Sequence, residues 1–112
     1  MLQKDLTDKT KAWNEILQSV RANTADIQTW SRRNGDGCYF RPDTMENQLI
    51  IRKSKERNPS CRINVVRTID YQQFERVANH FNQYIKGDIQ RTEMQNLGWN
   101  TSYIISLIVR FL

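Results

Sequence analysis

The spacing of apolar residues changes twice along the chain, and this change constrains the fold more than any other feature of the sequence. Four apolar residues near the start follow the three-and-four spacing of one helix face: Trp13, Ile16, Leu17 and Val20. This spacing predicts a helix over residues 5–22, with Asp5 as its N-cap. Strand-like apolar runs fill residues 23–70, and helical spacing returns over residues 71–112. Because 112 residues is the usual length of one domain, the sequence predicts a single α+β domain whose helices pack on one face of a sheet.

Short polar segments divide the central stretch into strands. The segment Asn34-Gly35-Asp36-Gly37 predicts a tight hairpin, because Asn-Gly and Asp-Gly pairs readily adopt positive φ. Strands are expected over residues 27–33, 38–41, 48–54 and 63–69, with Ile63, Val65 and Ile69 on one face of the last one. Residues 55–60, which include Pro59, are expected to form a hairpin tip, and Pro42-Asp43-Thr44 is expected to form a turn. The sequence therefore predicts a three- or four-stranded antiparallel meander.

The last part of the chain predicts two or three helices. Asp70 followed by Gln73 is typical of a capping box and marks the start of a helix, which Gly87 is expected to end. One apolar stripe runs along this helix: Phe74, Val77, Ala78, Phe81 and Ile85. A short helix, a turn at Gly98-Trp99-Asn100 and a last apolar helix are expected to follow. The domain thus divides into a helix (1–22), a basic β-meander (23–70) and a helical part (71–112).

The sequence offers little for catalysis or metal binding. It contains two cysteines, Cys38 and Cys61, and a single histidine, His80, whereas a structural zinc site needs about four ligands. We therefore expect no metal and no cofactor. No apolar run has the length of a secretory leader or of a membrane span, so we expect a cytoplasmic protein without a membrane partner. In that compartment the two cysteines are expected to be free and buried.

Two other functional classes stay open. Asp43, Glu46 and the lysines Lys53 and Lys55 are similar to the residues with which restriction nucleases hold Mg²⁺ and activate water. That family has an acidic residue two places before the lysine, whereas Ile51 stands two places before Lys53. The sequence therefore favours a protein that is not an enzyme and keeps a Mg-dependent nuclease as an alternative. The other alternative is a homo-oligomeric interaction or ligand-binding protein with a pocket of aromatic residues: Trp13, Trp30 and Trp99.

The net charge of the chain comes from its middle part. Lysine and arginine outnumber aspartate and glutamate by 17 to 12, which gives a net charge of +5. Residues 32–67 hold nine basic residues against four acidic ones, so this span accounts for the whole excess. Such a surface predicts binding to the phosphates of nucleic acid, DNA in the first place, although basic side chains also keep sheet edges from aggregating. The expected contacts in this span are Arg32, Arg33, Arg41, Arg52, Lys53, Lys55, Arg57 and Arg62.

A glycine separates two apolar-spaced segments between residues 90 and 109. Gly98 stands at the ninth place of this segment, and Leu97, Ile104 and Leu107 supply apolar residues around it. The segment resembles the helix-turn-helix of DNA-binding regulators, in which the ninth place is usually glycine; the fifth place, usually small, is Met94 here. The resemblance implies further DNA contacts from Arg91, Asn100, Thr101 and Ser102. Residues 91–103 are also similar to C-terminal segments of small proteins carried by phages, integrons and restriction systems, which implies a mobile-element origin.

The last helix allows more than one interpretation. Ile105 and Val109 stand where a recognition helix would read bases, and apolar residues there favour burial. Asn100 or Thr101 would then act as a helix cap. Because apolar residues cover more than one face of this helix, we expect a symmetric homodimer. Its interface is expected to contain Ile105, Ile108, Val109, Phe111 and Leu112.

Overall fold

The elements of the chain follow one another in the expected order. The computed structural model describes residues 8–31, 35–98 and 100–112. Its elements are α1 (Lys9–Ala22), β1 (Ile27–Ser31), β2 (Gly35–Met45), β3 (Gln48–Lys53), β4 (Arg67–Ile69), α2 (Tyr71–Lys86), α3 (Arg91–Gln95) and α4 (Thr101–Phe111). The strands form one antiparallel sheet in the order β1-β2-β3-β4. The prediction of an α+β fold with an antiparallel meander between helical parts is confirmed.

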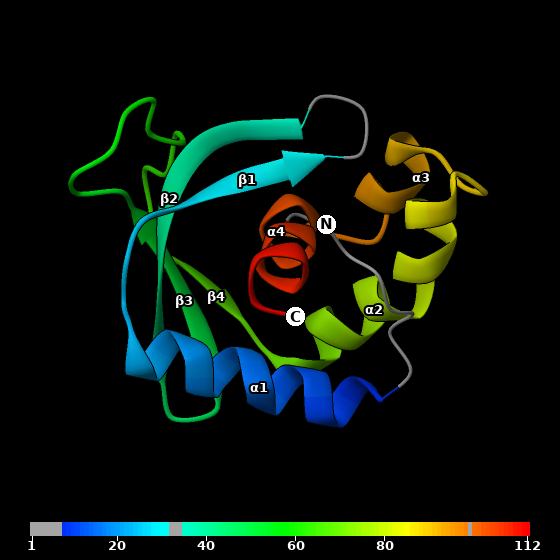
Figure 1. Cartoon of the computed structure of the whole chain (residues 1–112), viewed down its shortest axis with the longest axis horizontal. Coiled ribbons are helices and arrows are strands. Elements are labelled where there is room, and N and C mark those ends of the chain that lie inside the picture. The colour runs from blue at the N-terminus through cyan, green and yellow to red at the C-terminus, as the bar shows by residue number, and fades with distance from the viewer. Residues whose placement is uncertain (1–7, 32–34, 99) are drawn as a thin grey trace.

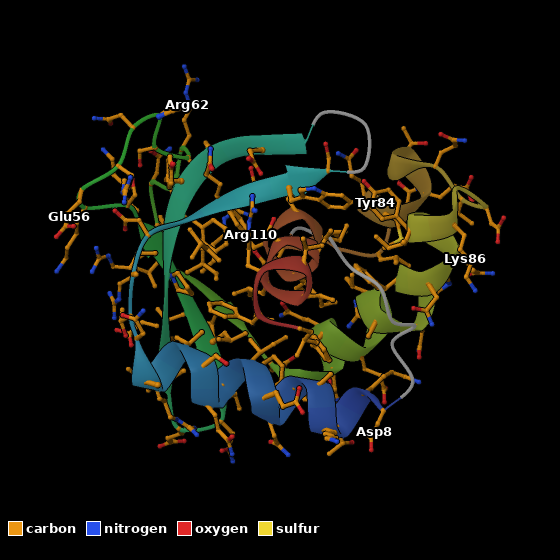
Figure 2. All side chains as sticks on the ribbon, viewed as in Figure 1. Asp8, Glu56, Arg62, Tyr84, Lys86 and Arg110 are labelled. Carbon is orange, nitrogen blue, oxygen red and sulfur yellow. A yellow bond between two sulfur atoms is a disulfide. The ribbon has the colours of Figure 1, made fainter. Side chains whose placement is uncertain are left out.

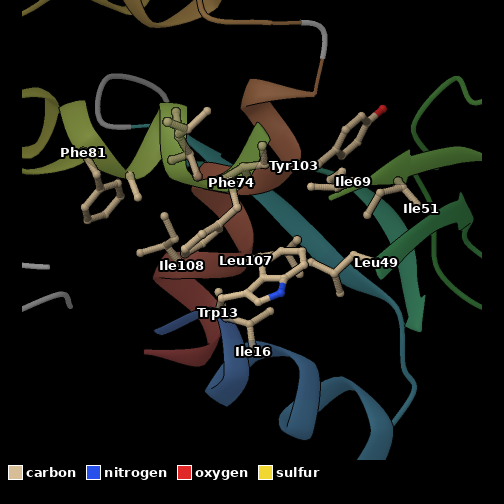
Figure 3. Close-up of a cluster of buried hydrophobic side chains, with 14 of the residues drawn as sticks. Trp13, Ile16, Leu49, Ile51, Ile69, Phe74, Phe81, Tyr103, Leu107 and Ile108 are labelled. Atoms are coloured by element: carbon tan, nitrogen blue, oxygen red, sulfur yellow. The ribbon is translucent and has the colours of Figure 1, made fainter. Parts of the chain in front are cut away.

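The last helix, α4, lies in the middle of the molecule. The sheet bends around α4, with β1 and β2 on one side of it and β3 and β4 on the next, while α1 and α2 cover the remaining sides (Figure 1). Side chains from α1, α2, β3 and β4 meet around α4 (Figure 3). They include Trp13 and Ile16 from α1, Leu49 and Ile51 from β3, Ile69 from β4, and Phe74 and Phe81 from α2. A central helix surrounded in this way can bury apolar residues on every face.

The helix ends follow ordinary capping chemistry. The first helix begins at Lys9, and Asp8 caps it by accepting a hydrogen bond of 3.0 Å from the backbone N–H of Lys11; the predicted cap, Asp5, lies outside the described residues. Asp70 caps α2 through the backbone N–H three residues on, at 2.9 Å, as predicted. Gly87 ends α2 with φ 83°, in the left-handed region that favours glycine.

The expected turn at residues 42–44 is wrong. These residues belong to β2, where Pro42 lies opposite Ile51 of β3. The pairing of β1 with β2 extends only to Phe40, so β2 is an edge strand at Pro42. Because no strand pairs with that side of Pro42, the N–H that proline lacks is not needed for a hydrogen bond between strands. The chain turns instead at Glu46 and Asn47, with φ 56° at Glu46.

The expected strand over residues 63–69 is also shorter in the structure. Only Arg67–Ile69 forms β4, and Val65 is 76% exposed rather than on the inner face. Residues 54–66 form a long loop, the β3–β4 loop, in place of the hairpin tip predicted at 55–60. The cause is a return of the chain onto β2: the backbone of Tyr39 donates to Pro59 O at 2.7 Å and accepts from the N–H of Cys61 at 2.8 Å.

None of the helices in the described part of the chain combines the length and the apolar character that crossing a membrane requires.

Candidate nucleic-acid interface

Four cationic side chains gather on the end of β3 and the loop that follows it. Lys53, Lys55, Arg57 and Arg62 are all exposed, and we call this set the basic surface. Among the described residues, no carboxylate forms an ion pair with any of the four. Figure 2 shows Arg62 and Glu56 at the outer edge of the loop, at the end of the molecule farthest from α2 and α3. Four of the eight basic residues predicted in this span are therefore exposed on one strand end and the loop that follows it.

A buried carboxylate holds the loop that carries these cations. The side chain of Asp26, just before β1, is only 2% exposed. It accepts hydrogen bonds from the backbone N–H groups of Glu56 at 2.7 Å and Lys55 at 3.1 Å, and from Arg41 Nε at 2.9 Å. Two consecutive backbone groups of the β3–β4 loop are thus fixed to the beginning of the sheet.

The donors around Asp26 keep it ionised. Burial alone raises the pKa of its carboxyl group, but the hydrogen bonds from Arg41, Glu56 and Lys55 outweigh burial and hold the pKa below its ordinary value. The partner, Arg41, was among the expected nucleic-acid contacts. Its side chain is 15% exposed and its guanidinium is paired with Asp26, so it supports the loop from beneath and is not part of the basic surface.

A disulfide and a β-bridge fix the same loop at a second place. Cys38 of β2 and Cys61 form a disulfide, with their Cα atoms 5.0 Å apart, within the ~4.4–6.8 Å that disulfides span. The expectation of free cysteines is wrong, because the pairing of Tyr39 with Ser60 brings two cysteines distant in the sequence side by side. Disulfides are typical of oxidising compartments, whereas the cytoplasm is reducing. The disulfide therefore gives no support to the predicted cytoplasmic location, which stays a prediction.

Two exposed or half-exposed arginines of the central span, Arg57 and Arg52, each have a neighbouring side chain. The guanidinium of Arg57 lies over the ring of Tyr39, 5.9 Å from its centroid. This cation–π contact favours one orientation of the long arginine side chain. Arg52 lies 3.7 Å from Asp43, and both side chains are more than two-fifths exposed. An exposed pair of this kind contributes little to stability, so Arg52 can exchange Asp43 for a phosphate.

Asn100 and Thr101, two further predicted contacts, do not lie on the basic surface. Arg32 and Arg33 lie outside the described residues, and Arg91 begins α3, on the opposite side of the molecule in Figure 1. The Asn100 side chain donates to Gln73 Oε1 at 3.1 Å, and Thr101 is 2% exposed with its hydroxyl bonded to Gly98 O at 2.9 Å. These contacts stabilise the turn before α4.

Most of the apolar surface of α4 is buried within the single chain. Ile105 and Ile108 are completely buried in the core of the single chain. The hydroxyl of Ser106 accepts from the backbone N–H of Trp30 at 2.8 Å, which joins α4 to β1. One chain therefore accounts for the apolar faces that were expected to need a second one. A dimer stays a prediction for the half-buried end of the helix: Val109, Phe111 and Leu112.

Sequence reasoning missed Asp26, the residue that organises the site. Its partners lie 15, 29 and 30 positions away, and no local pattern marks an aspartate before a strand as a clamp. In the described part of the chain, no three histidine, cysteine, aspartate or glutamate residues form a group that could hold a metal ion. Comparisons of the chain with models of protein families, with curated proteins and with solved structures found no match.

Proposed function

We propose that this protein binds nucleic acid, DNA in the first place, by placing the phosphate backbone on the basic surface. The observation that carries the proposal is the combination of four exposed cations, which form no ion pair with a carboxylate of the described residues, with a loop that Asp26 and the Cys38–Cys61 disulfide fix at two places. A fixed loop loses little conformational entropy on binding, so more of the electrostatic attraction is kept as affinity.

The distribution of charge supports this function over a role in solubility. Solubility needs charges spread over the surface, whereas here the whole net charge comes from residues 32–67. Two members of the basic surface, Arg57 and Arg62, are arginines, which bind phosphate oxygens with two parallel hydrogen bonds. The proposed contact does not use α4, because Ile105 is buried and Thr101 is bonded within the turn.

The test is the salt dependence of binding to a fluorescent 20-base-pair DNA duplex, measured by anisotropy. Each phosphate contact releases about 0.9 counterion, so four cations predict a slope of log K against log salt of about −3.6. Replacing three of them with alanine (Lys53→Ala, Lys55→Ala and Arg57→Ala) should reduce the slope to about −0.9 and lower the affinity at low salt roughly a hundredfold. Alanine at residue 55 keeps the backbone N–H that Asp26 accepts.

A matched variant separates a local surface from a general effect of charge. Three basic residues of α1 are replaced in the control: Lys9→Ala, Lys11→Ala and Arg21→Ala. Both triple variants lose the same charge, and alanine favours the helix in the control. The proposal expects the control to keep most of the slope. An equal loss in both variants, or no loss in either, would show that the basic surface does not bind DNA.

A further inference from the structure

A cavity adjoins the basic surface. It has a volume of about 380 Å³ and lies between the facing ends of β1 and β2, the β3–β4 loop and the first turn of α4. Trp30, Tyr103, Arg67, Thr29, Ser102 and Cys61 are among the residues that line it. Its volume falls within the ~300–1,000 Å³ of sites that take small organic groups. Of the predicted aromatic pocket, Trp30 lies here and Trp13 lies in the core, while Trp99 is outside the described residues.

The lining has the chemistry that a flat heterocyclic ring needs. Trp30 is half-buried and offers an aromatic surface, and the guanidinium of Arg67 lies 5.6 Å from the centroid of the ring of Tyr103, which is itself 9% exposed. Thr29, Ser102 and Asp36 also line the cavity, and the carboxylate of Asp36 is paired with Arg110. Aromatic and guanidinium planes bind nucleobases by stacking, and polar groups bind the edges of the ring.

The walls of the cavity are held in place by the core. The backbone N–H of Trp30 donates to Ser106 of the buried α4. The ring of Tyr103 packs edge-on against Phe40, with centroids 4.9 Å apart. The described walls of the cavity are therefore fixed by contacts with the core.

The cavity and the basic surface are connected through the β3–β4 loop. Cys61 lines the cavity, and the next residue, Arg62, belongs to the basic surface. A strand whose phosphates lie along the β3–β4 loop can thus place one of its bases inside. We propose that the cavity takes one unpaired base of a single-stranded nucleic acid; this inference rests on the proposed function of the basic surface. A duplex presents no such base unless a nucleotide is flipped out of the stack, which costs free energy.

The preference for single strands is the property to measure. Electrostatics alone favours the duplex, because its charge density is higher and its salt slope per contact is steeper, ~0.9 against ~0.7. Stacking of one base outweighs this difference, so we expect a 12-nucleotide single strand to bind about tenfold more tightly than the same sequence as a duplex. The indole N–H signal of Trp30, assigned by its loss in Trp30→Leu, should shift with the single strand and stay in place with the duplex.

Two variants and a control test the cavity itself. Trp30→Leu removes an aromatic wall, Ser102→Phe fills the space, and Gln18→Phe adds the same ring on the exposed face of α1 as a control. Both cavity variants should lose the preference for single strands and keep the affinity for duplex, and the control should keep both. If the cavity variants do not fold, the Trp30 signal of the unaltered chain, then assigned through the backbone by triple-resonance NMR, decides.

The outcomes separate the two proposals. Equal binding of single strand and duplex, both lost when Lys53, Lys55 and Arg57 become alanine, would overturn the base-binding cavity and leave the basic surface intact. A single-strand preference that survives both cavity variants would also overturn it. If neither nucleic acid binds, the proposed function fails, and the inference fails with it.

Discussion

Replacing Asp26 with asparagine is expected to release the β3–β4 loop from the sheet. The carboxylate accepts from three donors, namely the backbone N–H groups of Lys55 and Glu56 and the Nε of Arg41. Asparagine has the same shape but a single acceptor oxygen, and its NH₂ group would face some of these donors. Asp26→Asn thus removes the charge of the clamp and leaves at least one donor without an acceptor.

The size of the effect follows from the burial of the pair. Removing one partner of a buried ion pair costs ~3–5 kcal/mol, because the other charge stays buried without compensation. The Asp26 side chain is 2% exposed and that of Arg41 is 15% exposed, so the guanidinium can regain some water. We therefore expect the low end of the range, a loss of about 3 kcal/mol in the free energy of unfolding. For a chain of 112 residues, this corresponds to a fall of about 12 °C in Tm.

Urea and thermal unfolding, followed by tryptophan fluorescence, measure this loss, with Glu15→Gln on α1 as the control for a removed carboxylate. A loss below about 1 kcal/mol, the value typical of an exposed pair, would refute the clamp. The dependence on pH tests the same point. Because the pKa of Asp26 is lowered on folding, its contribution is complete above the unfolded value of ~3.9 and disappears as pH falls through the lower folded value. The difference between wild type and variant should therefore be constant from pH 7 to pH 5 and shrink below about pH 4.

Three further changes test other parts of the structure. Ile105→Glu should unfold the single chain rather than separate a dimer, since Ile105 is completely buried; a folded monomer by circular dichroism and sedimentation would contradict this. Replacing Cys38 and Cys61 with serine should cost ~3 kcal/mol of unfolding free energy in urea, because the bridge closes a loop over a separation of 23 residues. Gly87→Ala should cost ~1 kcal/mol in the same assay, because φ is 83° there; an unchanged midpoint would show that the C-cap is not strained by a side chain.

The sequence predicts well where the deciding interactions are local. Asp70 caps α2 through a residue three places on, and Gly87 ends α2 by its own φ value, so both ends of α2 are visible in a short stretch of sequence. The turn at residues 42–44 was misplaced because proline reads as a turn residue wherever its strand neighbours are unknown. Only the register of β1, which ends its pairing with β2 at Phe40, shows that Pro42 lies at a sheet edge.

The candidate site was only half predictable for the same reason. The excess of positive charge in residues 32–67 is a property of composition and was visible at once. The exposure of Arg41 and Lys55 depends on Asp26, because Asp26 binds the guanidinium of the first and only the backbone of the second. Its other partner, Glu56, is 30 positions away, so no local pattern shows this. Arg41 and Lys55 illustrate the difference, since both are basic residues of the same span. The first lies beneath the loop as a partner of Asp26, and the second lies on top of it.

The clamp also explains how a loop rich in cations keeps one conformation. Lys53, Lys55, Arg57 and Arg62 repel one another, and a free loop would relieve the repulsion by expanding away from the sheet. The carboxylate of Asp26 opposes this expansion from the inner side, because it is bonded to the backbone at residues 55 and 56 and leaves the cationic side chains exposed. Repulsion on the outer side is then relieved by the exposed carboxylate of Glu56 and by anions from solution. Phosphates that bind there should stabilise the folded chain by RT ln(1 + c/Kd), where c is the phosphate concentration, and weakening the clamp should lower the affinity without removing a single phosphate contact.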